Sequence, residues 1–179
     1  TYSYTVTDAN GCTASTSITV NEPALLTTTS SSTNITCNGS SNGTASVTAA
    51  GGTIPYTYLW SNNATFSTVS NLAPGTYSVV VTDANGCTSS ANVTITEPNV
   101  LSASASVSAP ILCNGGNATV AVSASGGTAP YVGVGNFNAP AGTQSYTVTD
   151  ANGCTASTSI TVNQPAILVA AASITSPII

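Results

Sequence analysis

Hydrophobic and polar residues alternate with a period of two along several short stretches of the chain. Tyr77, Val79 and Val81 share one side of such a stretch, and the same alternation occurs in residues 2–7 and 93–96. Successive side chains of a β-strand point to opposite faces of a sheet, so this pattern indicates strands with one buried face. Gly, Pro and Asn interrupt the alternation after about five to eight residues. The pattern therefore predicts an all-β protein built from short strands.

Several short motifs recur in the same order along the chain. Thr-Asp-Ala-Asn-Gly-Cys begins at Thr7, Thr82 and Thr149, with offsets of 75 and 67 residues, and Glu-Pro or Gln-Pro recurs with the same offsets. Cys-Asn-Gly and Gly-Gly-Thr-x-Pro-Tyr each occur twice. Motifs that share one order and nearly one spacing indicate a tandem array of repeats, and we expect this chain to be part of a longer one. We place the end of each repeat at the proline. Residues 1–23 are then expected to be the last two strands of a truncated repeat, and residues 24–98 a complete repeat. Residues 99–165 are expected to be a complete but shortened repeat, and residues 166–179 the first strand of a following repeat.

The first complete repeat has the length and punctuation of a seven-stranded sandwich. The Asn-Gly pair at 85–86 joins two alternating runs, which is a strong signal for a β-hairpin. Trp60 lies where immunoglobulin-like folds often bury a Trp, and residues 72–77 resemble the tyrosine corner of that fold. The predicted fold is therefore a head-to-tail series of immunoglobulin-like (PKD-like) β-sandwiches. The expected strands are residues 26–36, 43–50, 56–61, 64–67, 68–71, 75–83 and 87–96. The expected core residues are Trp60, Tyr77, Val79 and Val81.

The second complete repeat departs from the first in its middle. Between Tyr131 and Thr149 it is eight residues shorter than the first repeat, it has no Trp, and Gln144 stands where the first repeat has Tyr77. We expect it to have a thinner core and to lose or shrink the edge strands between its third strand and the strand that contains Gln144.

The charge composition excludes most enzymatic and polyanion-binding functions. The 179 residues include five acidic residues and no Lys, Arg or His, so only 3% are charged. Without His or Lys the chain lacks the usual general bases, the Ser-His pair and the Schiff-base amine. Without positive side chains it lacks the contacts that bind nucleic acid or anionic lipid. We therefore expect no enzyme activity, no catalytic residue and no nucleic-acid partner. No apolar run approaches the roughly 18 residues of a membrane span, so we expect no membrane insertion.

The five carboxylates occupy two kinds of repeat-equivalent position: the Asp of each Thr-Asp-Ala-Asn-Gly-Cys motif, just before its Asn-Gly turn, and a Glu before a proline. In a head-to-tail array, Asp83 would approach Glu22 at one junction, and Asp150 would approach Glu97 at the next. Such pairs would bind calcium if amide and carbonyl oxygens joined them. The interpretation we favour is simpler: each Asp supports its own turn, and each Glu is a solvated strand end. The sequence thus predicts no cofactor, with calcium at the junctions as the alternative.

The cysteines predict disulfides in an oxidising compartment, because they recur at equivalent positions and none forms a Cys-x-x-Cys pattern. In one sandwich, the Cys-Asn-Gly cysteine and the Asn-Gly-Cys cysteine are expected at opposite ends, roughly 20 Å or more apart. Bridged Cα atoms lie within about 7 Å of each other. We therefore favour a link between successive repeats, Cys37 to Cys154, with Cys12 and Cys113 pairing outside this chain. Pairing within each repeat, Cys37 with Cys87 and Cys113 with Cys154, is the alternative.

The set of motifs resembles a known family. Cys-Asn-Gly, Gly-Gly-Thr-x-Pro-Tyr and Gly-Thr-Tyr-x-Val-x-Val-Thr-Asp-Ala-Asn-Gly-Cys are similar to the SprB-type repeat of very large surface adhesins of gliding and biofilm-forming Bacteroidota. The resemblance is strong in residues 37–98 and weaker in residues 113–165. It implies export by the type IX secretion route, an extracellular location at the cell surface, and a role in adhesion or gliding motility.

Together these observations predict a structural repeat segment of a long extracellular adhesin or filament that acts as a mechanically robust stalk. Its expected partners are neighbouring repeats of the same chain and like fibres, because so little charge gives weak repulsion. A glycan or surface target would be bound elsewhere in the full-length protein. The alternative is a carbohydrate- or cell-binding module with Tyr56, Tyr58 and Trp60 as its platform. Alternation places these three on the face that is usually core, which favours the stalk.

Overall fold

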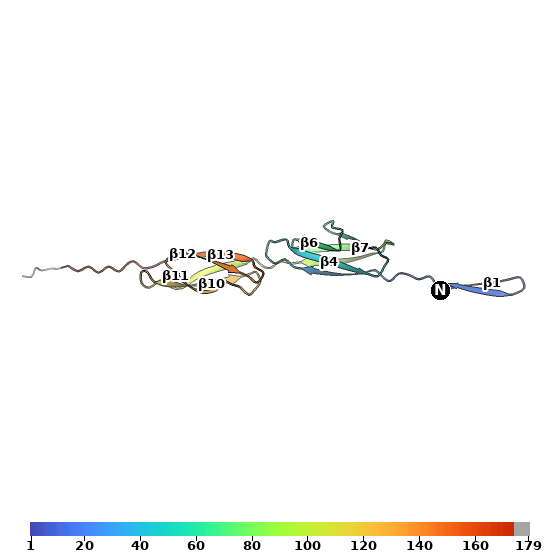
Figure 1. The fold of residues 1–179 in the computed structure, drawn as a ribbon, viewed down its shortest axis with the longest axis horizontal. Coiled ribbons are helices and arrows are strands. Elements are labelled where there is room, and N and C mark those ends of the chain that lie inside the picture. The colour runs from blue at the N-terminus through green and yellow to red at the C-terminus, as the bar shows by residue number, and fades with distance from the viewer. Residues whose placement is uncertain (174–179) are drawn as a thin grey trace, which may run out of the picture. The chain divides into compact units, whose positions relative to one another are not determined.

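The computed structural model describes residues 1–173, and every regular element in that range is a β-strand (Figure 1). The chain divides into two compact units. The division does not follow the repeat boundaries, because the loop Asn34–Gly43 and the turn Asn71–Pro74 belong to the same unit as the chain from Ile95 onward. The first complete repeat therefore contributes two of its connections to the second compact unit.

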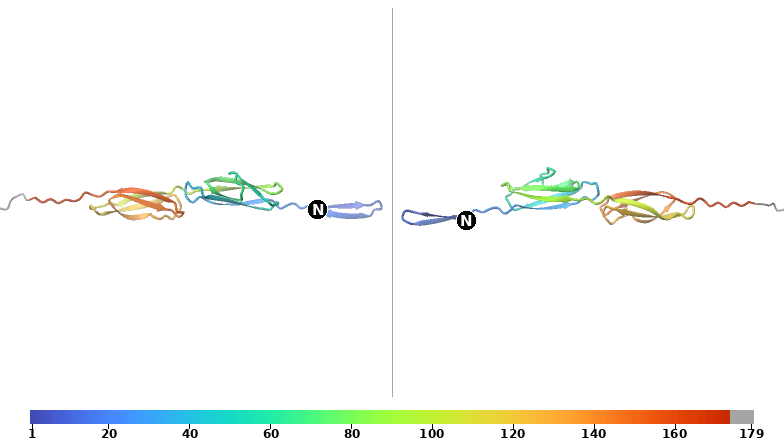
Figure 2. Two further views of the ribbon diagram at one scale, coloured as in Figure 1. Left: turned by 45° about the horizontal axis from the view of Figure 1, so that its top comes forward. Right: turned by 180° about the vertical axis from the view of Figure 1, so that it is seen from behind.

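Residues 24–98 form two three-stranded sheets. The strands are β3 (Thr27–Thr33), β4 (Gly43–Ala50), β5 (Thr57–Trp60), β6 (Thr68–Leu72), β7 (Gly75–Thr82) and β8 (Thr88–Ile95). One sheet has the order β3-β4-β6 and the other has the order β5-β7-β8. Two turned views show these strands gathered into one sandwich, coloured from blue to yellow-green (Figure 2). The predicted immunoglobulin-like sandwich is confirmed.

The core of this repeat consists of inward-facing side chains from alternate strand positions. Trp60, Val79 and Val81 are 1%, 0% and 0% exposed, as predicted, whereas Tyr77 is only half-buried. The indole Nε1–H of Trp60 donates to the carbonyl oxygen of Phe66 at 2.8 Å, so the buried ring keeps a partner for its polar atom. The other buried apolar side chains of the repeat are Leu26, Ile35, Ala45, Val47, Val69, Leu72, Val93 and Ile95.

The strand predicted at residues 64–67 is wrong, and the repeat has six strands. The backbone N–H of Trp60 donates to the carbonyl of Ala64 at 2.9 Å, and the N–H of Asn63 donates to the carbonyl of Trp60 at 2.8 Å. Asn63 has a positive φ of 65°, which Asn tolerates better than most residues. The segment after β5 therefore folds back over Trp60 as a loop instead of joining a sheet.

Residues 99–165 form a smaller sandwich. Its strands are β9 (Ser102–Ala109), β10 (Asn117–Ser125), β11 (Gly135–Pro140), β12 (Gly142–Thr149) and β13 (Thr155–Val162). The sheets have the orders β11-β10-β9 and β12-β13. The core cluster contains small residues and is formed by Ile111, Ala118, Val120, Val122, Ala139, Val148 and Val162. Phe137 and Tyr146 pack against it with their ring centroids 5.2 Å apart.

The shortening of this repeat affects a different strand from the one predicted. The counterpart of β5 is reduced to an isolated bridge between Val132 and Thr149, while β11 remains fully formed and pairs with β10. After Val132 the chain reaches β11 at Gly135, whereas seven residues separate β5 from β6 in the first repeat. A connection this short must cross to the other sheet at once, so no residues remain to extend a strand at Val132.

The segments outside the complete repeats are simpler. Residues 1–23 form one hairpin of β1 (Tyr2–Thr7) and β2 (Thr13–Ile18). Tyr2, Tyr4 and Val6, which correspond to the core positions of β7, are 60–69% exposed there. The predicted strand at 166–179 does not form over residues 166–173, where no described strand pairs with it, and residues 174–179 lie outside the described residues.

Hydroxyl groups pair across neighbouring strands on the outer faces of the sheets. Ser31 bonds to Ser46 at 2.8 Å, Thr33 bonds to Thr44 at 2.6 Å, and Ser104 bonds to Ser123 at 2.8 Å. Such cross-strand pairs contribute roughly 0.2–1 kcal/mol each. The polar positions of the alternating pattern thus bond to one another.

Candidate functional site at the Cys37 loop

The Asp of each Thr-Asp-Ala-Asn-Gly-Cys motif organises the turn that follows it. Asp83 Oδ1 accepts the N–H groups of Asn85 and Cys87 at 2.9 and 2.8 Å. Its Oδ2 accepts the N–H of Thr53 at 2.8 Å, so the same carboxylate also fixes the Gly-Gly-Thr loop. In the second repeat, Asp150 makes the equivalent bonds to Asn152, Cys154 and Thr128, each at 2.9 Å. Each Asp therefore joins two motifs that lie apart in the sequence.

These two carboxylates are held in their charged form. Asp83 and Asp150 are 5% and 4% exposed. The N–H of Thr53 is the main cause that lowers the pKa of Asp83, although burial raises it in part. For Asp150, burial raises the pKa, but the N–H donors of Thr128, Cys154, Asn152 and Gly153 together lower it below its ordinary value. Hydrogen bonds to a carboxylate favour its ionised state.

The glycines of the Gly-Gly-Thr motif make room for the Asp. Gly52 and Gly127 have positive φ angles of 59° and 55°. A Cβ on Gly52 would lie 2.8 Å from Asp83 Oδ2, and a Cβ on Gly127 would lie 2.7 Å from Asp150 Oδ2. A side chain at either position would therefore strain the backbone and collide with the carboxylate.

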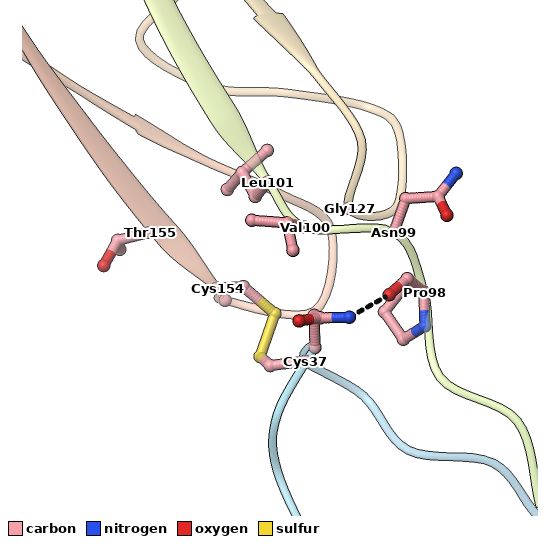
Figure 3. A pocket seen from close by; sticks show the side chains of 10 residues that line it. Cys37, Pro98, Asn99, Val100, Leu101, Gly127, Cys154 and Thr155 are labelled. Carbon is pink, nitrogen blue, oxygen red and sulfur yellow. Dashed lines mark hydrogen bonds between the residues drawn. A yellow bond between two sulfur atoms is a disulfide. The ribbon is translucent and has the colours of Figure 1, made fainter. Parts of the chain in front are cut away.

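A disulfide joins the loop after β3 to the turn before β13. Cys37 and Cys154 are bonded through their sulfurs, with a Cα–Cα distance of 5.7 Å and 117 residues of sequence separation (Figure 3). Beside the disulfide, the side-chain amide of Asn152 donates to the carbonyl of Thr36 and to the hydroxyl of Thr128, both at 3.0 Å. This is the pairing between successive repeats that the sequence favours, and pairing within each repeat does not form.

The Cys-Asn-Gly loop also binds the end of its own repeat. The side-chain amide of Asn38 donates to the carbonyl of Pro98 at 3.0 Å, the bond drawn as a dashed line to Pro98 in Figure 3. The N–H of Gly39 donates to Glu97 Oε2 at 2.7 Å. The second repeat has the same pair of bonds: Asn114 donates to the carbonyl of Pro165 at 2.9 Å, and Gly115 N–H donates to Gln164 Oε1 at 2.9 Å. The recurrence of Cys-Asn-Gly together with Glu-Pro or Gln-Pro is the sequence signal for this contact, although no contact between the two motifs is predicted above.

These bonds occupy three of the four carboxylates named above as alternative calcium ligands. Asp83 and Asp150 use both oxygens as acceptors for N–H groups, and Glu97 uses one. Glu22 lies in the exposed segment after β2. Among residues 1–173, no group of three or more His, Cys, Asp or Glu side chains is arranged to hold a metal ion. The neutral Gln164 also replaces the carboxylate of Glu97 in the equivalent contact, so the contact requires an acceptor and not a charge.

The remaining cysteines and the aromatic residues have their own places. Cys12, Cys87 and Cys113 are exposed and make no disulfide within the described residues. The hydroxyl of Tyr56 donates to the carbonyl of Gly51, and Tyr131 makes the equivalent bond to Gly126. With Trp60 buried, the aromatic residues considered for a sugar platform mostly stabilise the fold itself.

The fold and this linkage define the class of protein: tandem immunoglobulin-like sandwiches, with a disulfide that connects one repeat to the next. The SprB repeat family model matches residues 29–65 and 105–132, one segment in each complete repeat. Each matched segment contains a Cys-Asn-Gly and a Gly-Gly-Thr-x-Pro-Tyr motif, so the similarity to the SprB repeat covers the same motifs in both repeats.

Comparisons with other proteins add a structural neighbour. A search of curated proteins found no match. Among solved structures, the chain matches the N-terminal four Ig domains of Dscam1 isoform 6.44 with 14% sequence identity and a TM-score of 0.33. The match covers 87% of this chain and 52% of the other, so this chain spans about half the length of that structure. Residues 1–173 contain no helix long and apolar enough to cross a lipid bilayer.

Proposed function

We propose that this chain is a structural repeat segment of a long extracellular adhesin or filament, and that it serves as a load-bearing stalk in surface adhesion or gliding. The observation that carries the proposal is the Cys37–Cys154 disulfide. It connects one repeat to the next covalently, in addition to the peptide chain. A second covalent connection between repeats serves mechanical continuity and has no evident use in binding a ligand.

The extracellular location is supported by two features of the chain. Disulfides persist in oxidising environments such as the cell surface and are rare in the cytosol. The matched family, the SprB repeat, is identified here in both complete repeats. We infer that the chain acts outside the cell, attached to its surface, after export by the type IX route that the family resemblance implies.

The chemistry of the side chains favours a stalk over a binding module. The carboxylates of Asp83 and Asp150 are occupied by backbone N–H groups, and Trp60 is buried with its indole N–H bonded. With no Lys, Arg or His, the chain has few charged side chains that would bind a ligand. For the same reason we propose that it has no enzymatic activity, and that the adhesive target is bound elsewhere in the full-length protein.

Immunogold electron microscopy of the producing cells tests this proposal. Antibodies raised against the 179-residue chain should label thin fibres on the cell surface, with gold particles spaced along their length. Label found only in the medium, or on the envelope without fibres, would refute the stalk. Glycan-array binding by the purified chain would then support the carbohydrate-binding alternative, and a stalk predicts no such binding.

A further inference from the structure

The Cys37–Cys154 disulfide closes most of the two complete repeats into one covalent ring. The two cysteines are separated by 117 residues. All strands from β4 to β12 lie between them in the sequence, whereas β3 ends before Cys37 and β13 begins directly after Cys154. The ring therefore contains nine of the eleven strands of the complete repeats, and only β3 and β13 lie outside it.

We propose that tension along the fibre bypasses this ring and travels from β3 through the disulfide into β13. This inference rests on the proposed load-bearing function and specifies how the load is carried. A pull on the two ends of the chain is transmitted along the shortest covalent path. That path enters along β3, crosses the Cys37–Cys154 bond and leaves along β13. The strands within the ring then carry no net tension.

The two strands on the path are held in place along their whole length. β3 pairs with β4 at seven positions from Thr27 to Thr33, and β13 pairs with β12 at eight positions from Thr155 to Val162. With the disulfide intact, each strand is pulled at both of its own ends. The opposing pulls stretch the strand without dragging it out of its sheet.

Without the disulfide the load would fall on contacts between β3 and β8, which begin and end the first repeat. These contacts are side-chain bonds with little backbone pairing. Thr28 Oγ1 donates to the carbonyl of Ser90 at 3.3 Å, and Ser30 Oγ donates to the carbonyl of Asn92 at 3.4 Å. A backbone bond from Ile35 N–H to the carbonyl of Thr96, at 3.0 Å, follows at the end of β8. Opposing pulls on β3 and β8 would shear these bonds, and the repeat would then unfold.

The proposal predicts a large difference in extensibility. A fully extended chain spans about 3.3–3.6 Å per residue. The sequence separation of 117 residues therefore represents roughly 400 Å of chain length that the intact disulfide keeps from extending. This length stays hidden even if every strand inside the ring loses its structure.

Single-molecule force spectroscopy on the whole 179-residue chain, held by peptide tags at its two ends, tests the proposal. The oxidised chain should reach a final contour length roughly 400 Å shorter than the same chain pulled in the presence of a thiol reductant. Cys37→Ser and Cys154→Ser should each give the longer value without reductant. Cys113→Ser, which changes the equivalent but unpaired loop cysteine, should give the short value.

The contour length is measured after full extension, so the result holds even if a cysteine variant folds poorly. Equal final contour lengths for the oxidised chain and Cys37→Ser, whether both are short or both are long, would overturn the proposal. The test is independent of the proposed function. A length difference without surface fibres would refute the stalk and leave the bypass intact, whereas fibres without a length difference would refute the bypass alone.

Discussion

In residues 24–98 the third strand, β5, pairs with β7 and carries the buried Trp60, whereas in residues 99–165 its place holds only the bridge between Val132 and Thr149. At the sandwich ends, by contrast, the two repeats share two sets of hydrogen bonds. Asp83 and Asp150 each accept three backbone N–H groups, and both Cys-Asn-Gly loops bind the proline carbonyl that ends their repeat. The turns and loops at the sandwich ends require particular hydrogen-bonding atoms at particular positions, whereas the middle of a sheet requires only apolar side chains that face inward. The recurring motifs therefore lie at the ends.

The largest effect is expected from breaking the difference between the two loop cysteines. Cys37→Ser should lower the free energy of unfolding by about 4 kcal/mol, because a disulfide that closes a loop of about 100 residues or more strongly restricts the unfolded chain. Cys113→Ser, at the equivalent unpaired position, should change it little. Urea unfolding of the two variants, side by side, measures the difference. If Cys37→Ser lost no more unfolding free energy than Cys113→Ser, the disulfide would not be the source of the stabilisation.

Removing the aromatic core of the first repeat should separate the stabilities of the two repeats. Trp60→Ala leaves a cavity between the sheets and should cost about 3–5 kcal/mol in residues 24–98. Hydrogen exchange followed by mass spectrometry should show faster exchange in that repeat, with residues 99–165 protected as before. The matched control is Phe66→Ala, since Phe66 is 75% exposed and only its backbone carbonyl binds Trp60. A similar loss in the control would contradict this role of Trp60.

Glycines with the same backbone conformation but different surroundings should respond differently. Gly52→Ala places a Cβ against the Asp83 carboxylate, whereas at Gly86, with φ of 84°, a Cβ would meet nothing within 4 Å. Both variants strain the backbone by about 1–2 kcal/mol, and the collision should make Gly52→Ala the more destabilising. Thermal melts of the two variants decide the matter. A smaller loss for Gly52→Ala would mean that the carboxylate moves aside.

Acid should weaken both repeats through their buried Asp residues. The pKa of Asp83 is lower in the folded state than in the unfolded chain. Its carboxylate therefore stabilises the fold at pH values above the unfolded pKa. This stabilisation is lost as the pH falls through the folded pKa, below about pH 4. Asp83→Asn should reduce stability at neutral pH and flatten the decline in acid. Asp150→Asn should do the same in the second repeat. Urea unfolding midpoints between pH 7 and pH 2 measure this loss of stability, with Asp8→Asn in the exposed hairpin as the control. An unchanged decline in acid for Asp83→Asn would contradict the stabilising role of the Asp83 carboxylate.

The smallest effect is expected where one repeat already carries the alternative residue. Glu97→Gln reproduces the contact of Gln164 and should change the free energy of unfolding by less than about 0.5 kcal/mol. Calcium added to the chelated chain should leave the melting temperature unchanged in both the original and the variant. A calcium-dependent rise in melting temperature that Glu97→Gln abolishes would instead establish a cation site.

The sequence identifies the repeats, the sandwich class and the candidate disulfide because each depends on a pattern of fixed spacing. Alternation at Tyr77, Val79 and Val81 places β7, and the topology of such a sandwich separates the two cysteines of one repeat. Alternation alone does not reveal that the chain after Trp60 folds back on the indole, since that depends on a hydrogen bond to one buried side chain. The reduction of the strand at Val132 depends on the length of a connection between two sheets, which local composition does not encode.

The contacts of the Cys-Asn-Gly loop illustrate a second limit of the sequence. Asn38 and Glu97 lie far apart in the chain, and neither residue type on its own signals a contact. Their joint recurrence with Asn114 and Gln164 is visible in the sequence, but only the structure shows that each loop binds its own repeat end.

The hydroxyl pairs on the outer faces are bonds whose strength depends little on salt. Ser31 with Ser46 and Thr33 with Thr44 occupy cross-strand positions where a pair of opposite charges would also stabilise the sheet. Dissolved ions screen charge pairs at a surface but have little effect on bonds between neutral hydroxyls. A chain without Lys, Arg or His has no side-chain ion pair to lose. These cross-strand bonds are thus expected to hold equally well in fresh water and in brine.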